Sequence, residues 1–94
     1  MNKVDFIRSQ ILPVFKKYKV KRAGIFGSVA RGEDNIQSDI DILVELDDNL
    51  SLFDYIRMKL EIEEILGKSV DLVEYNTIKP FIKSKILEEE IRIL

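Results

Sequence analysis

Residues 27–44 read Gly-Ser-Val-Ala-Arg-Gly-Glu-Asp-Asn-Ile-Gln-Ser-Asp-Ile-Asp-Ile-Leu-Val, and this stretch decides how the rest of the chain is interpreted. The apolar run at 23–26 before it predicts a short buried strand, which Gly27 and Ser28 interrupt. Residues 29–31 then permit a short helical turn, whose backbone N–H groups would suit a phosphate. The run that ends the stretch predicts a second strand over about 39–46.

Two carboxylates stand two residues apart in this second strand. Because residues two apart share a face, Asp39 and Asp41 are expected on one side, with Ile40 and Ile42 on the other. Paired carboxylates suit Mg²⁺ when the ion also binds substrate phosphates. The alternative is two solvated strand residues opposite a buried face. Aspartate is depleted in strands, and neighbouring like charges need a cation, so the metal interpretation is favoured.

A third carboxylate, Asp71, lies in another apolar run at 70–74. If this run forms a strand beside the second one, Asp71 faces the same cluster as Asp39 and Asp41. Three carboxylates would allow a site for two ions about 3.5–4 Å apart. The alternative for Asp71 is again an exposed strand residue.

The Gly-Ser pair predicts phosphate binding only through its spacing from the aspartates. Gly27 would let the backbone approach a triphosphate closely, and Ser28 offers its N–H and hydroxyl groups. An ordinary strand-to-helix turn is the commoner meaning of such a pair. Arg31 either balances phosphate charge or pairs with a carboxylate on the sheet, and the sequence leaves both open.

The composition describes one small domain, expected over residues 1–94. The chain is 46% apolar and 34% charged, and its net charge of −2 gives no indication of extended nucleic-acid binding. With no histidine and no cysteine, any catalytic base must be a carboxylate, a lysine, a tyrosine or water. No run approaches the ~20 apolar residues of a membrane span, and no signal peptide is visible, so we expect a soluble cytoplasmic protein.

The periodicity of apolar residues places the other elements. A helix over 3–18 is expected to kink or restart at Pro13. A helix over about 52–66 is expected to be capped by Ser51 and to end at Gly67 in a left-handed conformation. The remaining expected elements are strands at about 20–26, 70–74 and 91–94 and a helix at about 78–88. This alternation predicts an α/β domain with a mixed sheet of three to four strands flanked by helices.

Two other groups of residues have ordinary interpretations. The lysines around the last helix are expected on a solvated face: Lys79, Lys83 and Lys85. The apolar residues of the 52–66 helix exceed one narrow stripe, so some belong to the core and the excess could form a partner surface. These are Phe53, Tyr55, Ile56, Met58, Leu60, Ile62 and Ile65.

The spacing of Gly27-Ser28 from Asp39-x-Asp41, ten residues on, resembles the signature of the nucleotidyltransferase superfamily that includes DNA polymerase beta. The longer strings at 26–32 and 38–44 resemble its minimal nucleotidyltransferases, the MntA-like antitoxins, and the resemblance covers nearly the whole chain. It implies the nucleotidyltransferase fold, ATP as substrate and two Mg²⁺ ions held by three catalytic carboxylates (Asp39, Asp41 and Asp71). It also implies that Asp71 activates the attacking hydroxyl and that Gly27, Ser28 and Arg31 bind the nucleotide.

The resemblance further implies a partner. Such proteins are antitoxins of type VII-like toxin–antitoxin pairs, which transfer AMP from ATP to a tyrosine hydroxyl of a HEPN-domain ribonuclease toxin and release pyrophosphate. Two alternatives stay open: a non-catalytic antitoxin that neutralises its toxin by binding, and nucleotidyl transfer to a small molecule. The absence of room for an acceptor domain weighs against the second. Nucleotide preference and oligomeric state, including a homo-oligomer, are not legible in the sequence.

Overall fold

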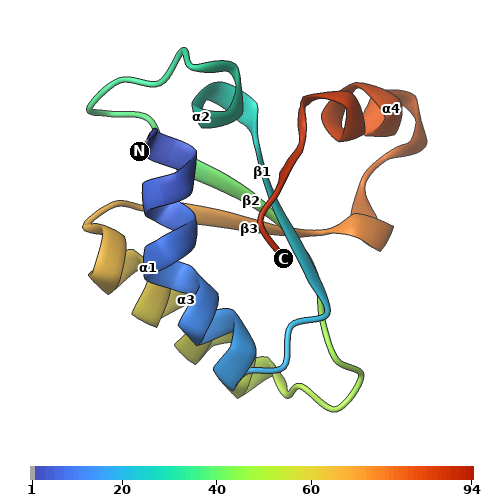
Figure 1. Ribbon diagram of the computed structural model, residues 1–94. Helices are drawn as coiled ribbons and strands as arrows, with labels where there is room; N and C mark the ends of the chain where they lie inside the picture. The colour runs from blue at the N-terminus through green and yellow to red at the C-terminus, as the bar shows by residue number, and fades with distance from the viewer. Residues whose placement is uncertain (1) are drawn as a thin grey trace.

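The computed structural model describes residues 2–94, in which helices and strands alternate (Figure 1). The elements are α1 (Lys3–Lys17), β1 (Arg22–Phe26), α2 (Gly27–Arg31), β2 (Ile40–Glu45), α3 (Leu52–Leu66), β3 (Val70–Glu74), the 3-10 helix η1 (Tyr75–Thr77), α4 (Pro80–Glu89) and β4 (Ile91–Arg92). They form an α/β domain with a mixed sheet flanked by helices. The predicted fold class is confirmed.

The four strands lie in the order β3-β2-β1-β4. β1 is antiparallel to both β2 and β4, whereas β2 and β3 are parallel. A parallel pair needs a crossover connection, which α3 provides. The third strand therefore adjoins the second, as the interpretation of Asp71 requires, and it forms one edge of the sheet.

The main core lies on the face of the sheet that α1 and α3 cover together (Figure 1). The strands bury their alternate residues there, which include Ala23, Ile25, Ile40, Ile42, Val44, Val70 and Leu72. Between these positions the side chains point to the opposite face, because successive side chains in a strand alternate. That second face carries Asp41 and Asp71.

The helix α1 excludes the restart, one of the two alternatives expected at Pro13. It runs unbroken from Lys3 to Lys17 with Pro13 inside it, so the chain does not restart there. A proline inside a helix costs about 3 kcal/mol through the lost hydrogen bond and ring clash. The neighbouring Ile11, Val14 and Phe15 are buried while Pro13 is exposed, so packing of the flanking residues keeps the helix continuous.

The expected helix ends are largely confirmed. The Ser51 hydroxyl accepts the Asp54 N–H at 3.1 Å, and Gly67 ends α3 with a φ of 65°. The last helix begins at Pro80 instead of 78, because Ile78 is extended and its side chain is buried.

The surplus of apolar residues on α3 is also confirmed. Met58 and Ile62 are fully buried, whereas Phe53 is 75% exposed and Leu60 is 58% exposed. Within residues 2–94, no helix has both the length and the apolar character needed to cross a membrane.

Candidate active site

Asp41 of β2 and Asp71 of β3 are partners in the parallel register. Adjacent strands lie about 4.7–4.9 Å apart, and partners in register point to the same face. Both carboxylates are on the face away from α1 and α3, because their neighbours along each strand are buried in the main core (Ile40, Ile42, Val70 and Leu72). The predicted juxtaposition of the second and third strands is therefore observed, and it brings these two acids together.

Asp39 lies one residue before β2, so the expectation that it belongs to the strand was wrong. The ladder ends at the register pair of Phe26 with Asp41, since the chain beyond Phe26 turns into α2 and offers no further strand. On the other side, the Ile40 N–H still donates to the Ser69 carbonyl at 3.1 Å. Asp39 is exposed but close enough for its charge to act on Asp41.

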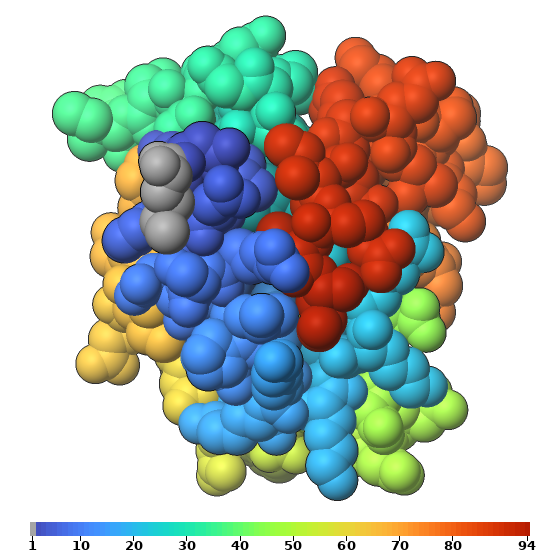
Figure 2. Space-filling view, viewed as in Figure 1, coloured from blue at the N-terminus to red at the C-terminus, as the bar shows by residue number. Residues whose placement is uncertain are grey.

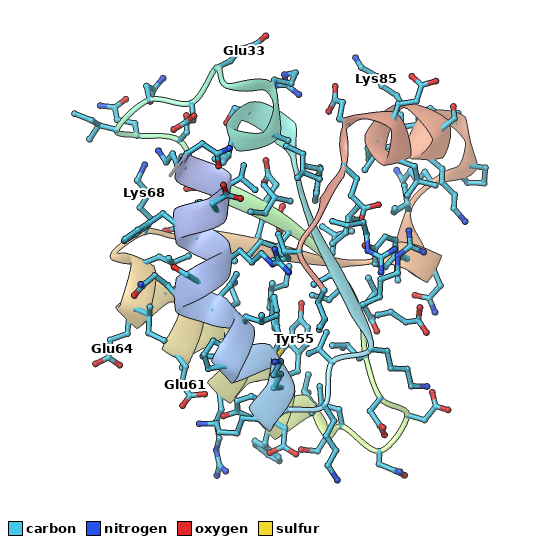
Figure 3. All side chains as sticks on the ribbon, in the orientation of Figure 1. Glu33, Tyr55, Glu61, Glu64, Lys68 and Lys85 are labelled. Carbon is cyan, nitrogen blue, oxygen red and sulfur yellow. The ribbon has the colours of Figure 1, made fainter. Side chains whose placement is uncertain are left out.

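The loop before Asp39 is held by the side chains of Ser38 and Lys68. The Ser38 hydroxyl accepts the Asn35 N–H at 3.0 Å, as a local backbone contact. Lys68, which lies beneath this loop in Figure 3, donates to the carbonyls of Asn35 at 3.2 Å and Ser38 at 3.4 Å. These contacts fix the chain as it enters β2, and so they position Asp39.

The three acids form a cluster of negative charge without a protein counter-ion. In the part of the chain that the structure describes, no lysine or arginine forms an ion pair with Asp39, Asp41 or Asp71. Partial burial raises the pKa of Asp41, and the charges of Asp71 and Asp39 raise it further, against a smaller opposing effect of Arg31. A bound cation would relieve this repulsion.

The acids fit a metal ion that is shared with a substrate. Among residues 2–94, no three acidic, histidine or cysteine side chains converge into a preformed metal centre. Mg²⁺ is commonly held by one or two carboxylates together with substrate phosphates and water, so a complete protein cage is not required. The register pair Asp41–Asp71 with Asp39 beside it supplies the hard oxygen ligands that such an ion prefers.

Gly27 is required where the backbone passes Asp41. Its φ is 74°, a left-handed conformation that side chains disfavour, and a Cβ placed there would lie 2.2 Å from Oδ2 of Asp41. The Gly-Ser turn and the carboxylate are thus in direct contact across β1 and β2. This contact explains why the two halves of the motif must occur together.

A pocket of ≈ 430 Å³ opens beside this contact. One side is formed by residues of β1, α2 and β2, which are Phe26, Gly27, Ser28, Arg31 and Asp41. The other side is formed by α4, through Ile82, Lys85, Ile86 and Glu89. Figure 2 shows α4 (orange-red) meeting the segment after β1 (teal to green) at the top of the molecule. The contribution of α4 was not expected from the sequence.

Arg31 is occupied by two carboxylates. Its Nε lies 3.0 Å from Glu33 and its Nη1 lies 3.1 Å from Glu89 of α4. Neither partner is on the sheet, so of the two alternatives for Arg31 the pairing with a sheet carboxylate is not observed. The guanidinium links α2 to α4 at the rim of the pocket.

The family model described as "Polymerase beta, Nucleotidyltransferase" matches residues 9–94. The chain belongs to this nucleotidyltransferase family. The match includes the Gly-Ser turn, both strands with acidic residues and α4, so the pocket lies wholly within it. The resemblance inferred from the motif is confirmed.

Relatives of this nucleotidyltransferase carry a more specific name. The chain is 50% identical over 91 residues to a candidate protein adenylyltransferase of Methanocaldococcus jannaschii, with 97% of this chain and 98% of that protein covered. It is 36% identical over 78 residues to the protein adenylyltransferase MntA of Thermococcus cleftensis, with coverages of 83% and 79%. A solved candidate minimal nucleotidyltransferase superposes with a TM-score of 0.81 at 36% identity, with coverages of 93% and 89%.

More distant structures share the fold. A toxin–antitoxin complex with AMP-PNP contains a chain that superposes with a TM-score of 0.77 at 21% identity, covering 93% of this nucleotidyltransferase and 72% of that chain. A complex of the MNT antitoxin with the tri-AMPylated HEPN toxin of Shewanella oneidensis gives 0.71 at 18% identity, with coverages of 96% and 71%. At these identities the likeness establishes the architecture.

Proposed function

We propose that this nucleotidyltransferase, as a single domain over residues 1–94, transfers AMP from ATP to a tyrosine hydroxyl of a HEPN-domain toxin and so acts as its antitoxin. The observation that carries the chemistry is the register pair of Asp41 and Asp71 next to the contact between Gly27 and Asp41. A protein acceptor is supported by the names of relatives at 50% and 36% identity, both protein adenylyltransferases. The HEPN partner is supported by the complex of an MNT antitoxin, a chain of the same fold, with a tri-AMPylated HEPN toxin.

Asp39 and Asp41 would hold Mg²⁺ at the triphosphate, and Asp71 would complete a two-ion site. When bound, Mg²⁺ supplies positive charge that stabilises the charge developing on the phosphate oxygens. Asp41 and Asp71 suit this role because they lie on the sheet, with Asp39 directly before it. None of the three has a lysine or arginine partner among residues 2–94. Arg31 contributes a further positive charge at the rim of the pocket.

Gly27 and Ser28 bind the triphosphate. The absent Cβ at Gly27 keeps the backbone open beside the Asp41 carboxylate, where a phosphate and its cation must fit together. Ser28 lines the same pocket and offers a hydroxyl and an N–H group. The α-phosphate is thereby held close to the acids.

Asp71 acts on the acceptor. It is exposed on the edge strand β3, so a hydroxyl presented by another protein can reach it. Asp71 accepts the proton of that hydroxyl as the oxygen bonds to the α-phosphorus, and the bond to the β-phosphate breaks to release pyrophosphate. The open side of the site suits a docking protein better than a small molecule.

The test is label transfer from ATP radiolabelled on its α-phosphate, with Mg²⁺ and the protein encoded by the neighbouring gene as candidate acceptor. Label on the partner supports the proposal, and ATP labelled on the γ-phosphate should give none, which separates AMP transfer from phosphorylation. Stable binding of the partner without label supports a non-catalytic antitoxin. Label found only on added small hydroxyl compounds supports small-molecule transfer. The matched control is Asp41→Asn, checked for folding.

A further inference from the structure

We propose that Lys85 of α4 binds the outer phosphates of the triphosphate and forms a second wall of the site, opposite Gly27 and Ser28. This inference rests on the proposed function and adds a residue outside the motif. Lys85 lines the pocket together with Gly27, Ser28 and Asp41, although it lies more than forty residues away in the sequence. Figure 3 shows it on the upper side of α4.

The charge balance of the pocket leaves Lys85 as the available cation. Arg31 is already paired with Glu33 and Glu89, at 3.0 and 3.1 Å. In contrast, no Asp or Glu of residues 2–94 lies within ion-pair distance of Lys85. An ammonium group with no carboxylate to satisfy it can pair with a phosphate, and such charge-assisted hydrogen bonds are the stronger kind.

The side of α4 that faces the pocket is defined by its residues. Lys85 and Glu89 are four apart, so they lie on one face of the helix, and Glu89 is held at that face by Arg31 of α2. Lys83 is two residues from Lys85, about 200° around the helix axis, and it does not line the pocket. Both lysines are exposed, which makes Lys83 a matched control on the same helix.

The position of α4 is fixed mainly at its end, because none of its ten residues, all described by the structure, is buried. The side chain of Glu90, directly after α4, is only 4% exposed. It accepts a hydrogen bond from the Tyr75 hydroxyl and pairs with Arg22 at 3.4 Å. It occupies the space that Gly24 leaves on β1, where a Cβ would lie 2.1 Å from Oε2 of Glu90. This buried anchor sets where Lys85 stands.

The experiment compares Lys85→Ala with Lys83→Ala by titration calorimetry, using Mg²⁺-ATP and AMP as ligands. The Lys85→Ala variant lacks one phosphate contact, so it should bind Mg²⁺-ATP about ten- to hundredfold more weakly than the wild type. Its affinity for AMP should change little. Lys83→Ala should bind both like the wild type, and Lys85→Arg should retain most of the ATP affinity. Since both lysines are exposed, the variants should keep the wild-type melting temperature.

The outcomes separate this inference from the proposed function. If the wild type binds Mg²⁺-ATP and the two variants, Lys85→Ala and Lys83→Ala, bind it with equal affinity, the role of Lys85 is overturned. The nucleotidyltransferase proposal then stays intact. Equal weakening of ATP and AMP by Lys85→Ala also overturns it, because the contact is then not to the outer phosphates. A wild type that binds no Mg²⁺-ATP overturns both.

Discussion

Asp41 and Asp71 stand side by side on parallel strands, on the sheet face that α1 and α3 do not cover. The partial burial of Asp41 raises the pKa of its carboxyl, and the nearby charge of Asp71 raises it further. The arrangement therefore disfavours the ionised acid in the protein alone and favours a cation. It is an arrangement that serves ligand binding at some expense of stability.

The raised pKa of Asp41 predicts a pH-dependent stability of the metal-free protein. The pKa of the Asp41 carboxyl is higher in the folded chain than its ordinary 3.8. The folded state therefore keeps the proton of this carboxyl up to a higher pH than the unfolded state does. The free energy of unfolding should therefore fall as the pH rises from that value through the folded pKa. Asp41→Asn removes this contribution, so its stability relative to wild type should increase between pH 4 and pH 7.

Urea unfolding in a chelating buffer at both pH values measures this difference. The comparison uses the change between the two pH values, so that any fixed packing effect of the asparagine cancels. A difference between variant and wild type that is the same at both pH values would contradict a raised pKa of Asp41 in the folded chain.

Two glycines separate steric contact from backbone strain. Gly27 and Gly32 have φ values of 74° and 72°, but only at Gly27 would a Cβ meet another atom, Oδ2 of Asp41 at 2.2 Å. Gly32→Ala should cost about 1–2 kcal/mol of stability from strain alone and leave transfer nearly normal. Gly27→Ala should cost more and should also displace Asp41, lowering transfer at least about tenfold.

The measurements are the free energy of unfolding and the transfer rate of each folded variant. Equal effects of the two substitutions on transfer would show that the contact between Gly27 and Asp41 has no catalytic importance.

The sequence predicted most of the part of the site that the Gly-Ser turn and the aspartates form. The period-two pattern of β2 and β3 places their acids opposite the core, and the crossover through α3 follows from two strands joined by a helix. The strand boundary at Asp39 was missed because it depends on where β1 ends, which is a property of the pairing with Phe26. Local patterns carry no such information.

The sequence could not reveal the α4 side of the site. Lys85 lies in a sequence typical of a solvated helix face. The contacts of Glu90 with Tyr75 and Arg22, and the pairing of Glu89 with Arg31, bring that face to the pocket. Lys68 was missed for the same reason, since its contacts with the loop before Asp39 join residues thirty or more apart. These contacts arise from the tertiary arrangement.

Chelation of metal should leave the fold intact. The main core lies beneath α1 and α3, on the other face of the sheet from Asp41 and Asp71, and needs no ion to form. Far-ultraviolet circular dichroism should be unchanged by a chelator, whereas Mg²⁺ with ATP should raise the melting temperature, because ligands that bind the native state stabilise it. Cooperative unfolding on chelation would contradict this separation of core and site.

The Glu90 anchor can be tested by a double-mutant cycle. Gly24→Ala places a Cβ 2.1 Å from Oε2 of Glu90, so it should destabilise the fold by about 1–3 kcal/mol and raise the KM for ATP by displacing α4. In a Glu90→Ala background the obstructing side chain is gone, and the same substitution should cost little. Additive effects of the two substitutions would exclude the packing of Glu90 over Gly24.

The decisive variant for catalysis is Asp71→Asn, because Asp71 is exposed at the sheet edge and its proposed role arises as the acceptor hydroxyl loses its proton. The measurement is the rate of AMP transfer to the HEPN-domain partner, taken beside the affinities for that partner and for Mg²⁺-ATP. We predict that the rate falls about a hundredfold or more while both affinities stay within about threefold of wild type. A folded Asp71→Asn protein that transfers AMP at the wild-type rate would contradict the assignment of these acids as the catalytic site.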